Sequence, residues 1–246
     1  MRPLVVLVHG SLSSARAWDG YDWLLPDADV LPLDLPGHGS NAHQPFTTEA
    51  ALGLIGAAVA RRSAAQRVIL AGHSLGGYLA YAFAARHQKL LDGLVLIGAS
   101  GDPQSRLADV YRGYAWLVQR VDHSRLGRIR DVVARWIGLS KDQVPDASAY
   151  ASLPAAWQAV MDDCPSTLMA RIDCPVLLLN GQFDQMRLTE RRYLQLAADA
   201  QLVHISHATH LAPMTHAAQV AAALWSFTEQ ILAPPSPGSS RGHWIG

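Results

Sequence analysis

The strongest constraint on the fold of this chain is an alternation of short apolar segments with longer helical ones. Six runs rich in Val, Ile and Leu lack the polar alternation of half-exposed strands; they cover residues 4–8, 30–33, 68–71, 94–97, 176–179 and 202–205. Such runs are typical of parallel strands buried on both faces. Between them lie Ala-rich segments long enough to be crossover helices, at residues 47–62, 75–87, 189–198 and 217–231. The pattern predicts an α/β fold, a mostly parallel sheet of about six strands flanked by helices.

One long interruption breaks this rhythm. The fourth and fifth expected strands are separated by roughly seventy residues, far more than the ~2–6 residues of an ordinary connection. Within the gap, apolar residues recur at helical spacing, as at Leu107, Val110, Tyr114 and Leu117. We therefore expect an α/β core at residues 1–101 and 169–232, with a helical cap inserted at residues 102–168. Pro, Gly and Ser dominate residues 233–246, a composition that predicts a disordered tail.

Composition and charge exclude several classes of function. Half of the chain is hydrophobic and the formal net charge is zero, so overall charge favours neither a nucleic acid nor an anionic membrane as partner. No apolar run reaches the ~20 residues of a membrane-spanning helix, and we interpret residues 1–8 as a first strand rather than a signal peptide. Cys164 and Cys174 provide neither a disulfide framework nor a zinc-site spacing. We expect a cytoplasmic protein that uses no metal and no organic cofactor.

A G-x-S-x-G motif at residues 72–76 is the strongest functional signal in the sequence. It follows an apolar run and precedes a helical segment, the strand–turn–helix setting that holds a nucleophilic serine at a sharp turn. The glycines fit because side chains two residues either side of the serine would collide with the neighbouring strand and helix. A phosphate-binding loop, the alternative, would need the Gly-Lys-Ser/Thr ending of a P-loop or the G-x-G-x-x-G spacing. Ser74 is therefore the predicted nucleophile.

A serine nucleophile needs a base, and the base needs a carboxylate that fixes its tautomer. On a fold of this kind the serine, the acid and the histidine follow one another along the chain, after successive strands. His210 lies in the loop after the last expected strand and is the predicted base. His207 is its nearest rival, whereas His204 falls inside the strand and His216 in the last expected helix.

The acid is expected at the end of the strand before that one. The apolar run at residues 176–179 is followed by Asn180, Gly181 and, three residues later, Asp184. This order supplies a strand, a turn glycine and a carboxylate, so Asp184 is the predicted acid. Asp102, after the fourth expected strand, remains the alternative because that position can also reach the histidine.

The loop after the first expected strand, which begins His9-Gly10-Ser11, is expected to complete an oxyanion hole. A backbone N–H of this loop normally acts together with the N–H of the residue after the nucleophile. We therefore predict that the N–H groups of Ser11 and Leu75 bind the oxyanion, with the Ser11 side chain facing the pocket. His9 is expected to hold the loop in place rather than to take part in the chemistry.

Taken in order, five motifs resemble those of the α/β-hydrolase superfamily; they lie at residues 8–11, 34–40, 72–77, 181–184 and in the His210 loop. The resemblance covers nearly all of the chain up to residue 232, apart from the cap. The resemblance implies an enzyme. Because its nucleophile is a serine, the dehalogenases and epoxide hydrolases of the superfamily, which use an aspartate nucleophile, are disfavoured. Esterases, thioesterases, lactonases, C–C bond hydrolases, perhydrolases and some lyases remain. The Asp-Leu-Pro-Gly-His-Gly-Ser segment at residues 34–40 resembles a turn that braces the active-site floor.

Among these, the chain looks most similar to small esterases and to the menaquinone-pathway lyase of this fold. That lyase resembles it in the Leu-Pro-Gly-His-Gly segment, but carries an arginine four residues after its serine that binds a substrate carboxylate. Here that position is Tyr78, and His73 stands where the lyase has a tyrosine. Both departures favour a serine hydrolase that cleaves an ester or thioester of a small to medium, mainly apolar acyl group through an acyl-enzyme on Ser74. A lyase, a C–C bond hydrolase and a catalytically silent small-molecule binder remain alternatives.

The expected cap is rich in aromatic and basic side chains. We expect most of the aromatic ones to pack in its core and some to form an apolar acyl site. The candidate substrate contacts are His9, His73, Tyr111, Tyr114 and Trp136. The cap arginines are expected to form a solvated helix face, with a contact to coenzyme A or a carrier protein as the alternative; they are Arg106, Arg112, Arg120, Arg125, Arg128, Arg130 and Arg135.

Overall fold

The computed structural model describes residues 1–105 and 149–234. These residues form a six-stranded sheet of β1 (Leu4–Val8), β2 (Asp29–Leu33), β3 (Val68–His73), β4 (Gly93–Ile97), β5 (Val176–Gly181) and β6 (Ala200–Ile205). All neighbouring strands are parallel, in the order β2-β1-β3-β4-β5-β6. Each strand includes the apolar run that predicted it. The expected α/β fold with a parallel sheet is confirmed.

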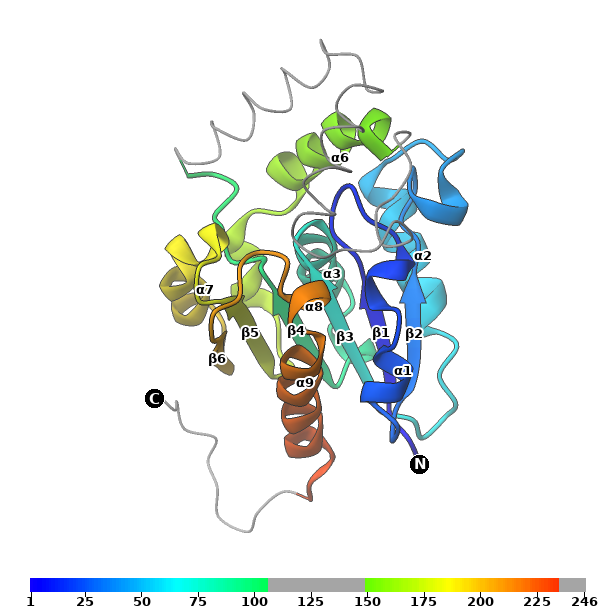
Figure 1. Cartoon of the computed structure of the whole chain (residues 1–246), viewed down its shortest axis with the longest axis vertical. Coiled ribbons are helices and arrows are strands. Elements are labelled where there is room, and N and C mark those ends of the chain that lie inside the picture. Colours follow the sequence, from blue (N-terminus) through cyan, green and yellow to red (C-terminus); the bar gives the residue numbers. More distant parts are fainter. Residues whose placement is uncertain (106–148, 235–246) are drawn as a thin grey trace.

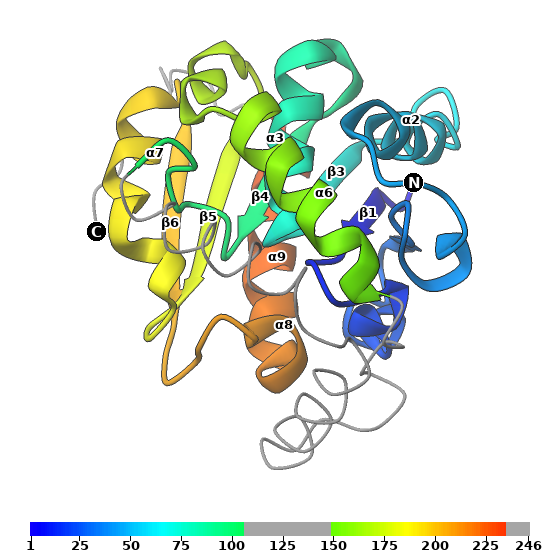
Figure 2. The ribbon, with the colours of Figure 1, turned by 90° about the horizontal axis from the view of Figure 1, so that it is seen from above.

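Helices cover both faces of the sheet because the pleat sends alternate side chains to opposite sides. Val5 and Leu7 of β1 pack into one core, and Val6 and Val8 into another. The first core is covered by α1 (Tyr21–Leu24), α8 (Ala212–Thr215) and α9 (Ala217–Leu232). The second is covered by α2 (Thr48–Val59), α3 (Leu75–Arg86) and α7 (Glu190–Leu196). Figures 1 and 2 show the two helical layers with the sheet between them.

The expectation that every strand is buried on both faces is wrong for the two edges of the sheet. β2 and β6 are largely half-exposed or exposed, whereas the four inner strands are buried throughout. Pro32, inside β2, was a sequence signal of this arrangement, because proline lacks an N–H donor and is confined to edge strands and strand ends. Apolar content alone does not distinguish an edge strand from an inner one.

The strand order reverses at β1, and this reversal fixes where a ligand site can form. The chain runs from β1 outward to β2 and then returns to the other side of β1 to form β3. In open parallel sheets, ligands bind at the carboxyl ends of the strands where the order reverses. The loop after β1 and the turn after β3 meet at that place, and α6 (Ala149–Asp163) lies across this end of the sheet (Figures 1 and 2).

Helix α6 is held on the core by polar and steric contacts. The Thr48 hydroxyl at the start of α2 donates to the carboxylate of Asp163 at the end of α6. Near the other end, Ser152 packs so closely on Gly37 that a Cβ at Gly37 would lie 2.5 Å from the Cβ of Ser152. The expected cap at residues 102–168 includes α6, but its stretch at 106–148 lies outside the described residues.

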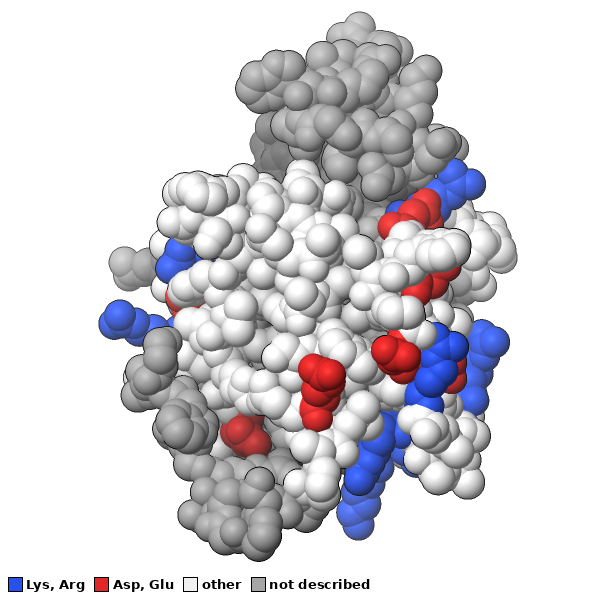
Figure 3. Space-filling view, turned by 60° about the horizontal axis from the view of Figure 1, so that its bottom comes forward, with Lys and Arg blue, Asp and Glu red and all other residues white. Residues whose placement is uncertain are grey.

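The surface carries charge of both signs. On the face shown in Figure 3, basic and acidic side chains lie mostly along one side and are interspersed, and much of the described surface there is uncharged. This distribution agrees with a net charge of zero. None of the helices formed by residues 1–105 and 149–234 has the length and apolar character of a membrane span.

Candidate active site

Ser74 stands at a sharp turn between β3 and α3 in a strained backbone conformation. Its φ is 50° and its ψ is −119°, values that L residues rarely adopt. The flanking glycines make the turn possible, as the sequence predicted. A Cβ at Gly72 would lie 2.3 Å from the Gly76 carbonyl oxygen, and a Cβ at Gly76 would lie 2.4 Å from the Val8 carbonyl oxygen.

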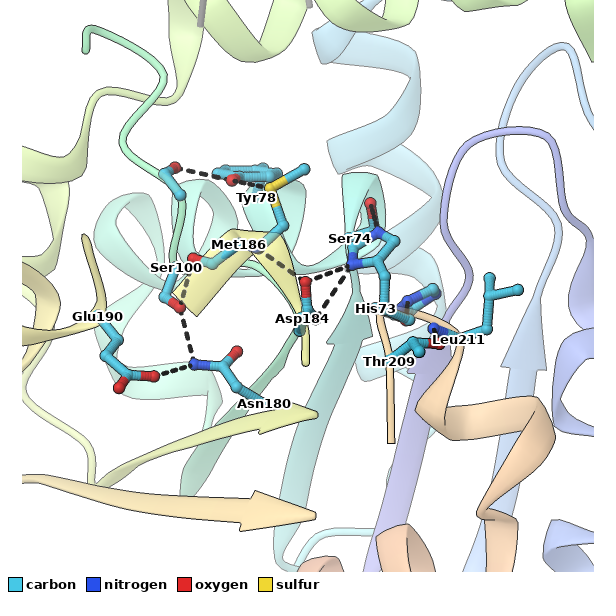
Figure 4. Close-up of polar contacts among 12 residues, drawn as sticks. His73, Ser74, Tyr78, Ser100, Asn180, Asp184, Met186, Glu190, Thr209 and Leu211 are labelled. Atoms are coloured by element: carbon cyan, nitrogen blue, oxygen red, sulfur yellow. Dashed lines mark hydrogen bonds and ion pairs between the residues drawn. The ribbon is translucent and has the colours of Figure 1, made fainter. Parts of the chain in front are cut away.

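The structure brings Ser74, His210 and Asp184 together in one chain of hydrogen bonds. The Nε2 atom of His210 lies 3.0 Å from the Ser74 hydroxyl oxygen. The Nδ1 atom lies 3.1 Å from each carboxylate oxygen of Asp184. Because a carboxylate only accepts, Nδ1 carries the proton and Nε2 is left to accept the proton of the serine hydroxyl. Figure 4 shows Asp184 and Ser74 converging from the ends of different strands.

The rival residues lie elsewhere. His207 is exposed, and His204 on β6 bonds Glu190 with its Nε2 at 3.1 Å from Oε2. His216 was expected inside the last helix, but it is the N-cap residue that precedes α9. The carboxylate of Asp102 pairs instead with Arg192, at 3.3 Å from its Nε.

Asp184 is held as a carboxylate in a buried position. Burial opposes its ionisation, but hydrogen bonds from His210 and from the Met186 N–H outweigh that effect, so the pKa of Asp184 is lower than its ordinary value. The Met186 N–H lies 2.8 Å from Oδ1. The carboxylate is thus fixed from two sides, which in turn fixes the orientation of the His210 ring.

Gly98 is a site residue that sequence reasoning missed. It follows β4 with a φ of +57°, and a Cβ there would lie 2.8 Å from Oδ2 of Asp184 and 3.0 Å from Nδ1 of His210. The absence of a side chain at Gly98 therefore leaves room for the acid–histidine pair. The Gly98-Ala99-Ser100 segment after an apolar run was the available signal, but only the folded geometry shows what the glycine faces.

A buried polar network behind the acid was also missed. The side-chain amide of Asn180 donates to the hydroxyl of Ser100 at 2.9 Å and to the carboxylate of Glu190 at 2.8 Å (Figure 4). The Ser100 hydroxyl donates to the Met186 carbonyl at 3.1 Å. Met186 is therefore held through its N–H by Asp184 and through its carbonyl by Ser100. Asn180, a polar residue at the end of an apolar strand, is the signal that could have revealed this network.

The two residues predicted for the oxyanion hole, Ser11 and Leu75, line the same cavity as the nucleophile. Leu75 is the first residue of α3, so its N–H has no acceptor within the helix and lies at the positive end of the helix dipole. Ser11, in the loop after β1, lines the same cavity as Ser74. This loop passes so close that a Cβ at Gly10 would lie 3.1 Å from the Ser74 Cβ.

His9 and His73, two of the predicted substrate contacts, are not among the described residues that line this cavity. His9 is fully buried; its Nδ1–H donates to the Gly10 carbonyl at 2.7 Å, and its Nε2 accepts the Leu35 N–H at 3.0 Å. Burial and the nearby His38 lower the pKa of His9 to about 3. His9 is thus a neutral brace for its loop, as the sequence suggested.

A cavity of about 230 Å³ opens beside Ser74 and has mainly apolar walls. Leu75 and Tyr78 of α3 form one side, and Trp157 and Met161 of α6 form another. Asp102 is the only charged residue in the described wall. Tyr111, Tyr114, Trp136 and the cap arginines from Arg106 to Arg135 lie outside the described residues. In residues 1–105 and 149–234, no three His, Cys, Asp or Glu side chains gather as a metal site requires.

A parallel sheet with a serine turn, followed by an acid and then a histidine after later strands, is the arrangement of an α/β hydrolase. Residues 5–223 match the family model described as "Alpha/beta hydrolase family". The chain belongs to that family.

Known proteins similar to the chain include two kinds of enzyme. A Neisseria meningitidis pimeloyl-[acyl-carrier protein] methyl ester esterase is 29% identical, over 94% of this chain and 78% of its own length. A Klebsiella pneumoniae 2-succinyl-6-hydroxy-2,4-cyclohexadiene-1-carboxylate synthase is 28% identical, over 94% of each chain. Among solved structures, a thermophilic esterase from Thermogutta terrifontis superimposes with a TM-score of 0.77 at 24% identity, covering 94% of this chain and 91% of its own. That likeness supports the fold alone.

Proposed function

We propose that the protein is a serine hydrolase that cleaves an ester or thioester with a small to medium, mainly apolar acyl group. The observation that carries this proposal is the Ser74–His210–Asp184 chain of hydrogen bonds, with the His210 Nε2 atom 3.0 Å from the serine oxygen at an apolar cavity. The complete set of nucleophile, base and acid disfavours a silent binder. The esterase relative supports the same reaction class.

The geometry suggests a two-step reaction. Ser74 attacks the carbonyl carbon while its proton passes to Nε2 of His210, and the N–H groups of Ser11 and Leu75 hold the oxyanion. The tetrahedral intermediate collapses, and the leaving alcohol or thiol takes the proton from His210. Water then attacks the acyl-enzyme with His210 as base, which releases the acid and restores the serine.

The described part of the cavity wall favours a neutral acyl group over a carboxylate-bearing one. The Tyr78 hydroxyl donates to the Gly101 carbonyl at 2.7 Å. The carboxylate of Asp102, the only charge in the described wall, is neutralised by Arg192. Among the described residues this wall offers a substrate carboxylate no cation, and Tyr78 stands where the lyase would carry its arginine, which supports ester or thioester cleavage over the lyase alternative. A carrier-protein or coenzyme A contact through the cap arginines belongs to the thioester form of the proposal.

The test is hydrolysis of 4-nitrophenyl esters of increasing acyl length, followed by a thioester of the best acyl group. We expect the wild type to cleave short or medium esters, and Ser74→Ala to lose roughly 10⁴–10⁶ of the rate. His210→Ala should fall comparably, whereas His207→Asn, which changes the exposed neighbouring histidine, should stay near the wild-type rate. A wild type inert towards every ester and thioester would sink the proposal and favour a lyase or C–C hydrolase, to be assayed on dicarbonyl substrates.

A further inference from the structure

His73 stands at a junction between the three parts of the site. It is the last residue of β3, directly before Ser74, and its side chain is buried. The Nε2–H of the ring donates to the main-chain carbonyl of His210 at 2.8 Å. The rings of His73 and His210 lie 4.9 Å apart at a tilt of 43°. On its other side His73 touches the loop after β1, since a Cβ at Gly10 would lie 2.9 Å from its Nδ1.

The contact with His210 is needed because that residue lies in an irregular loop. Between β6 and α8 no strand or helix hydrogen bonds fix the main chain. Two carbonyls of this loop are held from outside. The Ala208 carbonyl accepts the Phe183 N–H at 2.9 Å, from the turn that carries Asp184. The His210 carbonyl accepts the ring of His73, from the strand that carries Ser74. The base is thus tied to both the acid and the nucleophile.

The protonation state of His73 suits this task. Its Nε2 is the donor to a carbonyl, so the neutral ring leaves Nδ1 without a proton. Nδ1 is buried and has no hydrogen-bond partner among the described residues. Burial, together with the neighbouring His210, lowers the pKa of His73 to about 3. His73 therefore stays neutral at ordinary pH and adds no positive charge beside His210 when that ring takes the serine proton.

We propose that His73 is a positioning residue, whose Nε2–H holds the His210 main chain so that the imidazole stays at bonding distance from the Ser74 hydroxyl. The proposal rests on the hydrolase function proposed above. His73 is not among the described residues that line the cavity, so in this proposal it acts through His210. A group shifted by as little as 1 Å in a catalytic site can cost ~10² in rate, so the loss of this anchor should appear in the catalytic step.

Two variants separate the hydrogen bond from the bulk of the ring. His73→Phe keeps a ring of similar size but has no donor, whereas His73→Gln places an amide N–H near the position of Nε2. With the best 4-nitrophenyl ester, we expect His73→Phe to lower kcat by about 10–100-fold with KM within about twofold of the wild type. His73→Gln should recover most of that loss. Equal kcat values for the two variants, or an effect confined to KM, would overturn the proposal.

A spectroscopic measurement tests the anchor without any substrate. Long-range ¹H–¹⁵N NMR of the histidine rings should show His73 protonated at Nε2 and His210 at Nδ1. The His210 Nδ1–H signal should broaden through exchange with water in His73→Phe and stay sharp in His73→Gln. A His73 ring protonated at Nδ1 would leave no donor for the His210 carbonyl, and the proposal would fail. If the wild type cleaves no ester, the hydrolase proposal fails while this measurement still decides the role of His73.

Discussion

At the scale of single residues, the site depends on positions where a side chain is missing as much as on those where one acts. Gly98 combines a positive φ with contact to the acid–histidine pair. We expect Gly98→Ala to lower kcat/KM by about 10² or more, because the new methyl group would displace the Asp184 carboxylate or the His210 ring. The loss is measured with the ester that the wild type cleaves best.

A second glycine provides the control for this prediction. Gly20 also has a positive φ, of +84°, but a Cβ there would meet nothing within 4 Å. Gly20→Ala should therefore show the same kind of backbone strain, on the order of 1 kcal/mol in the free energy of unfolding, with activity preserved. Equal activities of the two variants would show that the space at Gly98 does not matter to the site.

At the scale of elements, α6 supplies the part of the cavity wall that no motif predicts. Trp157 and Met161 lie on this helix, and the Thr48–Asp163 hydrogen bond ties its end to α2. We expect Thr48→Val to loosen α6 and to broaden the acyl-length preference, with kcat for the best ester within a few-fold of the wild type. The measurement is the ratio of kcat/KM between long and short 4-nitrophenyl esters.

The adjacent threonine is a matched control for that variant. The side chain of Thr47 caps α2 by accepting the Ala50 N–H at 3.1 Å, and among the described residues it makes no hydrogen bond to α6. Thr47→Val should cost about 1 kcal/mol in the free energy of unfolding and leave the acyl-length preference as it was. If both variants shift the preference alike, general destabilisation rather than the seat of α6 is the cause.

The sequence predicts elements better than it predicts what their side chains meet. Apolar runs locate all six strands, although only the four inner ones are buried throughout, and the serine turn follows from glycine spacing. The contact of His73 with the His210 carbonyl joins positions far apart in the chain. So do the bonds from Asn180 to Ser100 and Glu190. Such pairs depend on register and on loop geometry, which no local pattern encodes.

At the scale of the whole molecule, two buried neutral histidines make stability depend on pH. Burial is the main reason that the pKa values of His9 and His73 are lowered from 6.5 to about 3. Below pH 6.5 the unfolded chain binds a proton at each of these residues, whereas the folded protein does not until the pH approaches 3. Their contribution to stability is therefore complete above pH 6.5 and is lost as the pH falls.

This linkage predicts a steep loss of stability in mild acid. For each such proton, a fall of one pH unit raises the unfolding equilibrium constant up to tenfold, so His9 and His73 together should reduce the free energy of unfolding by about 3 kcal/mol per unit between pH 6 and 4. Asp184, whose pKa is also lowered, adds to the loss only at lower pH, near the ordinary value of a carboxyl group. Urea unfolding at a series of pH values measures the slope, and His73→Phe, which removes one of these protons, should reduce it by about 1.4 kcal/mol per pH unit. A free energy of unfolding that stays constant from pH 7 to 5 would mean that these rings take up protons in the folded protein. The claim that His73 stays neutral beside His210 would then be wrong.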